Sequence, residues 1–322
     1  MTAFTVITKV QAAVELRVVA SKTNDSSKEV FNSGGFRYIP HMTLAPPIVL
    51  TIAGFDPTSG AGVTADIKTI AAHGCYGVTA ITALTVQSTA GVRQVSAVDP
   101  QMLTDSLEEL NADVKVSAVH IGMLGSGEVA RRVAGFLEAA KLPNVVLDPI
   151  LRATSGASLL DQAGVRVLTE KLVSLANVLT PNTEEAAALT GMKVESVDEM
   201  KQAALCLHEM GAKGVVITGG NLERAIDVLS LKDEYVQIFR SDRVNAENTH
   251  GTGCAFSTAI TCQLAMGRSL SAAVLMSKAY VTAAITNGYQ IGKGPGPVNH
   301  MYQMKNHPKA AGLSRKLASG RD

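Results

Sequence analysis

Short apolar runs alternate with longer amphipathic stretches along most of this chain. Residues 48–53 form an apolar and β-branched run that ends at Gly54, whereas the apolar residues of 63–72 recur at a helical spacing. The first pattern predicts a buried strand and the second predicts a helix. This pair is the first of several along the chain.

The same alternation predicts the elements that follow. Strands are predicted at 78–85, 116–121, 145–147, 177–180 and 215–218. Helices are predicted at 102–111, 127–140, 184–189, 197–210, 253–265 and 270–287. The runs 225–229 and 235–239 flank a charged triplet and predict an edge hairpin. Strands that alternate with helices indicate an α/β fold with a mostly parallel sheet and helices on both faces.

The two ends of the chain differ from the rest. Residues 21–35 are rich in Ser, Asn and Lys and show no sustained hydrophobic period, and Met42 lies just before the first predicted strand. We therefore expect residues 1–45 to be an N-terminal extension that is disordered or not native to the protein. Residues 46–305 are expected to form one domain, and residues 306–322 a C-terminal tail.

Composition narrows the classes of partner. The 322 residues are 46% hydrophobic and 18% charged, which is typical of a globular protein with a substantial core. A formal net charge of +1 gives no electrostatic reason to expect nucleic acid or a membrane as partner. No apolar run reaches the roughly 18 residues of a membrane-spanning helix. The four cysteines include no CxxC pair, which favours reduced thiols and a cytoplasmic location.

Polar or glycine residues follow nearly every predicted strand. In an open parallel sheet, ligands bind at the carboxyl ends of the strands, so these residues are expected to converge on one site. In strand order they are Gly54, Gln87, Gly122 with Met123, Asp148, Asn182, and Gly219 with Gly220.

A glycine-rich loop, residues 248–254 with the sequence NTHGTGC, precedes an apolar helical run. The glycines let backbone N–H groups approach a ligand closely, and the helix that starts here adds the positive end of its dipole. We expect Gly251, Thr252 and Gly253 to bind a phosphoryl group. Cys254 would sit at the same helix start, where a thiol ionises more easily. The alternative is a loop that caps an ordinary helix. The sequence contains neither a Walker A motif nor a GxGxxG after the first strand.

Four other candidates also have structural interpretations. Asn182 followed by Glu185 forms a capping-box pattern, but Glu185 could also serve Mg²⁺ and phosphates through water. Gln87 ends an apolar run, so its amide is either satisfied by backbone or offered to a heterocycle. Met123 suits the core or an apolar pocket wall. Asp66 either points back toward the loop 56–62 or is a solvated helix residue.

Several histidines and cysteines are expected to be structural. His73, His120 and His208 are scattered along the chain, and we expect structural or surface positions for them. Cys75 and Cys262 are expected to be small core residues.

Further motifs accompany the glycine loop in a fixed order. They are TIAGFD (51–56), SGAG (59–62), ADIKT (65–69), ITALTVQ (81–87), IGML (121–124), VVLDP (145–149), TPN (180–182) with EA (185–186), GKG (292–294), GPV (296–298) and His300. In this set and spacing the chain resembles the ribokinase-fold vitamin kinases, and most closely the bacterial hydroxymethylpyrimidine/phosphomethylpyrimidine kinases. The resemblance runs from about residue 48 to His300.

The resemblance implies a ribokinase-like three-layer fold and a set of roles for the residues of these motifs. The implied reaction is ATP- and Mg²⁺-dependent phosphorylation of 4-amino-5-hydroxymethyl-2-methylpyrimidine, then of its monophosphate, in thiamine biosynthesis. A homodimer is implied as well. The implied roles are an anion hole at Gly251, Thr252 and Gly253, a base at Cys254, a pyrimidine pocket of Gln87, Gly54, Asp66 and Met123, nucleotide contacts at Asn182, Thr218 and Gly220, and a metal site at Glu185 and Asp148.

The chain departs from this pattern at Thr218, which stands where many of these pyrimidine kinases have Lys. The second phosphorylation is the activity that this departure most affects. Pyridoxal kinases of the same family can carry Thr there, so the alternative is a pyridoxal or pyridoxine kinase. Gln87 favours an aminopyrimidine. A non-catalytic binder of the same fold is disfavoured because Gly251, Gly253 and Cys254 are all present.

Overall fold

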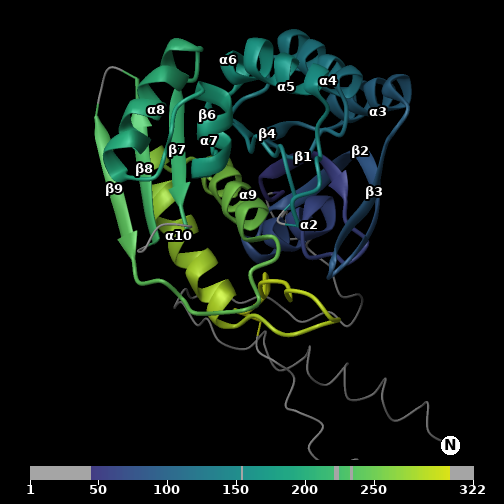
Figure 1. Cartoon of the computed structure of the whole chain (residues 1–322). Helices are drawn as coiled ribbons and strands as arrows, with labels where there is room; N and C mark the ends of the chain where they lie inside the picture. Colours follow the sequence, from purple (N-terminus) through teal and green to yellow (C-terminus); the bar gives the residue numbers. More distant parts are fainter. Residues whose placement is uncertain (1–44, 154, 221–224, 233–234, 305–322) are drawn as a thin grey trace, which may run out of the picture. The chain divides into compact units, whose positions relative to one another are not determined.

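The computed structural model describes residues 45–153, 155–220, 225–232 and 235–304. These residues form a nine-stranded sheet in the order β3-β2-β1-β4-β5-β6-β7-β8-β9 (Figure 1). The strands are β1 (Ile48–Phe55), β2 (Tyr76–Ser88), β3 (Gly91–Ala97), β4 (Val116–Ile121), β5 (Val145–Leu147), β6 (Val178–Leu179), β7 (Gly214–Gly219), β8 (Ala225–Leu231) and β9 (Val236–Ser241). Pairing is parallel from β2 to β7 and antiparallel at both edges.

Helices cover both faces of the sheet. The helices are α2 (Gly62–Ala72), α3 (Pro100–Asp113), α4 (Gly127–Ala140), α5 (Gln162–Val167), the π-helix η1 (Leu168–Leu172), α6 (Val173–Leu175), α7 (Thr183–Thr190), α8 (Val197–Glu209), α9 (Thr252–Ala265) and α10 (Leu270–Thr286). Residues of α3, α4 and α8 share one apolar core, and residues of α9 and α10 share another. The expected three-layer α/β fold is confirmed.

Alternation along the central strands assigns side chains to the two cores. In β5, Val145 and Leu147 belong to the core with α4, whereas Val146 belongs to the core with α9. Successive residues of a strand point to opposite faces, so a strand covered on both faces is mostly apolar along its whole length. This is why the short runs of the sequence predicted these strands well.

The start of α9 differs from the starts of α4, α7, α8 and α10. Side chains cap α4 (Ser126), α8 (Ser196) and α10 (Ser269), and α7 has a full capping box. Helix α9 instead begins at Gly251, in the left-handed region at φ 81°, with no side-chain cap. The backbone N–H groups of its first turn therefore have no side-chain acceptor.

Two parts of the fold were missed by the sequence pattern. Strand β3 was not predicted because none of its residues is buried, so no apolar face marks it in the sequence. It pairs with β2 and extends the sheet by one edge strand. The segment from α5 to α6 was also not predicted, because it breaks into short helical turns around η1. The predicted N-terminal extension and C-terminal tail lie almost wholly outside the described residues. Among the helices that the structure describes, none is both long and apolar enough to cross a membrane.

Candidate active site

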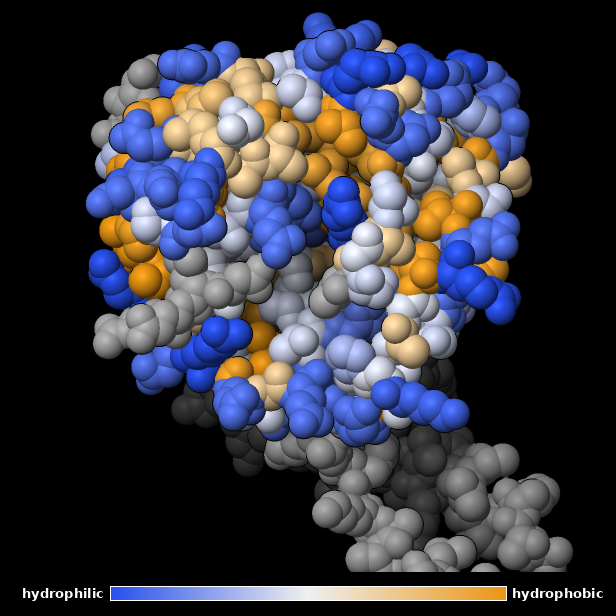
Figure 2. Space-filling view, viewed as in Figure 1, coloured by the Kyte–Doolittle hydropathy of each residue, from blue (hydrophilic) through white to orange (hydrophobic). Residues whose placement is uncertain are grey.

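Two adjoining cavities open at the carboxyl ends of the central strands. The first has a volume of about 250 Å³ and the second about 630 Å³. Every residue to which the sequence analysis gave a site role lines one or both of them, whereas Gly219, also expected at the site, lines neither. The residues shared by both are Arg152, Ala153, Asn182, Glu185, Thr218, Thr252, Gly253 and Phe256. In Figure 2, hydrophilic side chains cover much of this view, and hydrophobic ones show between them toward the middle.

The glycine loop lies where the two cavities meet. Thr252 and Gly253, the first residues of α9, line both cavities. A Cβ at Gly251 would overlap the carbonyl oxygen of Gly60, so no other residue fits this approach of the two loops. The uncapped helix start thus directs its N–H groups and positive dipole end to the junction, as anion binding requires.

His250 holds the loop after β1 against the glycine loop. Its Nε2 lies 2.8 Å from Asp56 Oδ2, which also accepts the N–H of Ala61 at 3.0 Å. Asp56 is buried, and burial alone would raise its pKa; the hydrogen bonds from His250 and Thr58 outweigh burial and lower the pKa. The sequence analysis assigned no role to His250, although its place inside the glycine loop was a signal.

Gln87 presents its amide to the first cavity beside this clamp. Its Oε1 accepts the Thr85 hydroxyl at 3.2 Å, and its Nε2 lies 3.5 Å from His250 Nε2. In the same cavity, the Met123 side chain packs against Gly54, where an added Cβ would lie 2.8 Å from the Met123 sulfur. The cavity therefore combines an amide with an apolar wall.

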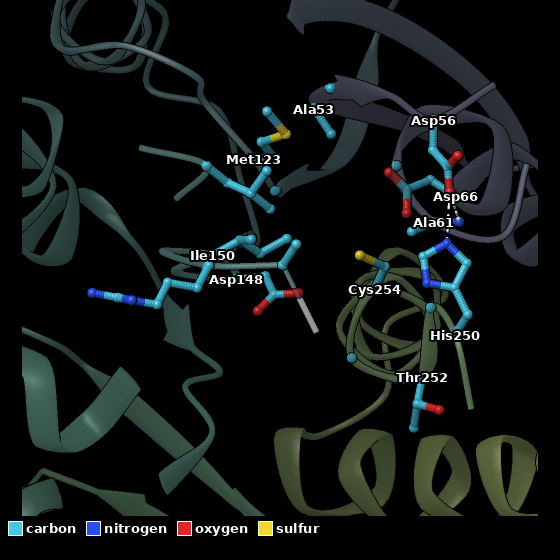
Figure 3. A pocket seen from close by; sticks show the side chains of 18 of the residues that line it. Ala53, Asp56, Ala61, Asp66, Met123, Asp148, Ile150, His250, Thr252 and Cys254 are labelled. Atoms are coloured by element: carbon cyan, nitrogen blue, oxygen red, sulfur yellow. Dashed lines mark hydrogen bonds and ion pairs between the residues drawn. The ribbon is translucent and has the colours of Figure 1, made fainter. Parts of the chain in front are cut away.

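Asp66 is not a solvated helix residue. It is fully buried and accepts the hydroxyls of Thr51 at 2.7 Å and Thr258 at 2.8 Å. Nδ1 of the buried His120 lies 3.3 Å from the same carboxylate. Figure 3 shows Asp66 beside Asp56 and Ala61, near Cys254. The carboxylate lines the first cavity while its charge is satisfied within the core.

A buried chain of polar contacts continues from His120 to the second carboxylate. His120 Nε2 lies 2.9 Å from Ser257 Oγ, which donates to Asp148 Oδ2 at 3.1 Å. With Ser257 donating to Asp148, both ring nitrogens of His120 donate, which is the imidazolium form. Burial opposes that charge, but the carboxylates of Asp66 and Asp148 outweigh it and raise the pKa of His120. His120 is structural, as expected, yet it links two site carboxylates.

Asp148 and Glu185 form an acidic pair suited to a hydrated cation. Burial raises the pKa of Asp148 to about 6, and burial with the nearby Asp148 raises that of Glu185 to about 8. Glu185 also accepts the Asn182 N–H at 2.9 Å. The same side chain therefore completes the capping box of α7 and lines both cavities. No group of three acidic, His or Cys ligands occurs among the described residues. Mg²⁺, which keeps several waters and is bound through one or two carboxylates plus phosphates, fits this donor set.

Cys254 is partly exposed at the junction, but its expected ease of ionisation is wrong for this structure. Burial, Asp148 and Asp66 raise the pKa of its thiol well above the ordinary value, although the Gly62 N–H opposes them. Burial, together with neighbouring negative charge, outweighs the helix dipole that motivated the expectation. A proton-accepting role for Cys254 therefore requires those charges to be neutralised.

The second cavity extends from Thr218 and Gly220 along α10. At its wall, Lys278 Nζ lies 2.7 Å from Asp227 Oδ2, and the two side chains are 11% and 9% exposed. The sequence analysis did not single out this pair, because nothing in the pattern of α10 or β8 distinguishes it from a surface ion pair.

The comparisons with known proteins agree with this architecture. A family model described as "Phosphomethylpyrimidine kinase" matches residues 56–299. A Haemophilus influenzae protein, hydroxymethylpyrimidine/phosphomethylpyrimidine kinase, is 42% identical over 257 residues, 78% of this chain and 96% of that protein. The ADP complex of Bacillus subtilis pyridoxal kinase has a TM-score of 0.75 and 34% identity, covering 81% of this chain and 100% of that one. Phosphomethylpyrimidine kinase from Clostridium difficile has a TM-score of 0.67 and 36% identity, covering 74% and 99%.

The first prediction concerns the glycine loop. Gly251→Ala is expected to lower the affinity for ADP by more than about tenfold, because the methyl group pushes the loop away from Gly60. Gly267→Ala is the matched control, since Gly267 also has a positive φ, at 78°, but its Cβ would meet open space. Isothermal titration calorimetry measures both variants. An ADP affinity of Gly251→Ala equal to that of Gly267→Ala would contradict a tight fit at Gly251.

The second prediction concerns pH. The pKa of a Glu carboxyl is about 4 in an unfolded chain, whereas burial and Asp148 raise the pKa of Glu185 to about 8 in the fold. Between these two values the native state keeps a proton that the unfolded state has lost. Stability is therefore expected to fall as pH rises from about 5 through 8. Glu185→Gln should flatten this fall in thermal unfolding, and Glu138→Gln, at an exposed position on α4, should not. Parallel curves for wild type and Glu185→Gln would refute this.

Proposed function

The chain belongs to the phosphomethylpyrimidine kinase family, and we propose that it phosphorylates 4-amino-5-hydroxymethyl-2-methylpyrimidine and then its monophosphate. The observation that carries the proposal is the junction at the uncapped start of α9, where a small cavity meets a larger one. Such an arrangement brings an acceptor and a phosphoryl donor together over backbone N–H groups. The names of the Haemophilus influenzae and Clostridium difficile proteins support this acceptor.

The first cavity suits a single substituted ring. Its volume of about 250 Å³ leaves room for one heterocycle between the Met123 wall and the Gln87 amide. An amide offers a donor and an acceptor side by side, which matches the ring nitrogen and amino group of an aminopyrimidine. Gly54 and Asp66 complete the lining.

The second cavity is the proposed site of ATP. Asn182, Thr218 and Gly220 lie along it, with Asp148 and Glu185 on the side of the junction. These two carboxylates would hold Mg²⁺ through its water shell, and Mg²⁺ would neutralise charge on the donor phosphates. The raised pKa values of both carboxyls fit this role, because a nearby cation favours their charged forms.

Cys254 is the proposed acceptor of the hydroxymethyl proton. Its sulfur accepts the Gly62 N–H, which holds it at the junction. Neutralising Asp148 and Glu185 removes two of the charges that raise the thiol pKa. The thiol would thus become a base only in the assembled complex, where the acceptor hydroxyl is also in place.

A homodimer and a cytoplasmic location are further proposals. Ile81, Leu84 and Val86 on β2 are 36%, 52% and 42% exposed, and these apolar side chains could pack against a second copy. Sedimentation equilibrium that shows a monomer at micromolar concentration would refute the dimer. All four cysteines are free, which is typical of a reducing compartment.

Pyridoxal kinase is the second candidate, favoured by the similarity to the Bacillus subtilis enzyme. The third prediction separates the two by measuring ADP release with hydroxymethylpyrimidine, its monophosphate and pyridoxal. Wild type is expected to turn over both pyrimidines with higher kcat/KM than pyridoxal. Gln87→Met should lower the pyrimidine value about tenfold or more, because the amide contacts are lost. Turnover of pyridoxal alone would overturn the proposal.

The fourth prediction tests the proton acceptor. Cys254→Ala is expected to lower kcat for hydroxymethylpyrimidine by about a hundredfold or more, in the usual range of general-base catalysis. Cys206→Ala on α8, which lines neither cavity, is the matched control for a lost thiol. Near-full turnover by Cys254→Ala would show that the anion hole acts without this base.

A further inference from the structure

We propose that Arg152 forms a phosphate subsite at the junction, which binds the phosphate carried by the acceptor in the second transfer. The inference deepens the proposed function and rests on it. It concerns a residue that neither the sequence motifs nor the reaction chemistry of the first transfer required.

Arg152 brings positive charge to a cavity whose other charged side chains are mostly carboxylates. Asp66, Asp148 and Glu185 line this cavity, and Arg152 is the one Lys or Arg among its described lining residues. Lys278, in the second cavity, is already engaged by Asp227. Among the described residues, no carboxylate forms an ion pair with Arg152. Its charge is therefore available to a ligand anion.

The backbone holds Arg152 at the junction. After Asp148 the chain turns back on itself. The backbones of Arg152 and Ser158 form an isolated antiparallel β-bridge, and the Leu159 N–H donates to the Leu151 carbonyl at 3.0 Å. The Leu151 N–H also donates to Glu185. The base of this short hairpin is thus tied to the carboxylate pair, and Arg152 lines both cavities from it.

The acceptor of the second transfer brings more negative charge to the junction of the two cavities than the acceptor of the first. In the first transfer the acceptor is a neutral alcohol. In the second, an oxygen of the acceptor phosphate attacks the γ-phosphorus of ATP, the bond to the ADP oxygen breaks, and a diphosphate forms. That oxygen is already ionised, so no proton has to be removed. A phosphate monoester carries about −1.5 to −2 charges near pH 7. A guanidinium facing this phosphate makes the charge-assisted, bidentate contacts that phosphates favour.

Binding without ATP tests the subsite directly. Calorimetry with the pyrimidine monophosphate is expected to show a loss of affinity of about 10- to 100-fold in Arg152→Met, the range for a hydrogen bond to a charged group. Arg152→Lys should recover part of it by keeping the charge. Arg131→Met, which removes an exposed arginine paired with Glu128 on α4, should bind as wild type does. Unchanged affinity in Arg152→Met would overturn the subsite.

The ratio of the two transfers gives a second readout. Arg152→Met should lower kcat/KM for the monophosphate relative to hydroxymethylpyrimidine by at least about tenfold. Thr218 lines the same junction, so adding Thr218→Lys to Arg152→Met should restore part of the ratio by returning a cation. An equal fall in both transfers would contradict the subsite and assign Arg152 to the donor phosphates. If wild type binds hydroxymethylpyrimidine but not its monophosphate, only the subsite fails; if it binds neither, the proposed function fails as well.

Discussion

The close approach of Gly251 to the carbonyl of Gly60 is the constraint on which the site depends. It needs a residue without a Cβ at positive φ, and it joins the loop after β1 to the start of α9. His250 and Asp56 reinforce the same contact by a hydrogen bond of 2.8 Å. Because this contact fixes where α9 begins, it also fixes where the uncapped N–H groups meet the two cavities.

Negative charge at the junction is the second physical theme. Asp66 and Asp148 are buried, and the chain through His120 and Ser257 links them, which spreads one positive charge between two carboxylates. Ser257 Oγ also lies 3.1 Å from the carbonyl oxygen of Gly253, so the same hydroxyl contacts the anion loop. Burying carboxylates is costly unless they are paired or bound to a cation. The site is therefore arranged to receive positive charge together with phosphate.

The sequence predicted most of this, for identifiable reasons. Strands covered on both faces are mostly apolar, so β1 and β4 to β7 were predicted, and their carboxyl ends located the site. The side-chain contacts within that site could not be predicted, because contacts such as that of His250 with Asp56 join positions far apart in the chain. The pKa of Cys254 was expected in the wrong direction, since only the folded arrangement places Asp148 and Asp66 beside it.

The most direct test is a crystal structure with ADP, Mg²⁺, aluminium fluoride and hydroxymethylpyrimidine, since aluminium fluoride imitates a phosphoryl group in transfer. The account predicts the fluoride on the N–H groups of Gly253 and Cys254, between ADP in the larger cavity and a ring held by Gln87. Fluoride bound away from the start of α9, or a pyrimidine bound away from Gln87, would contradict the account.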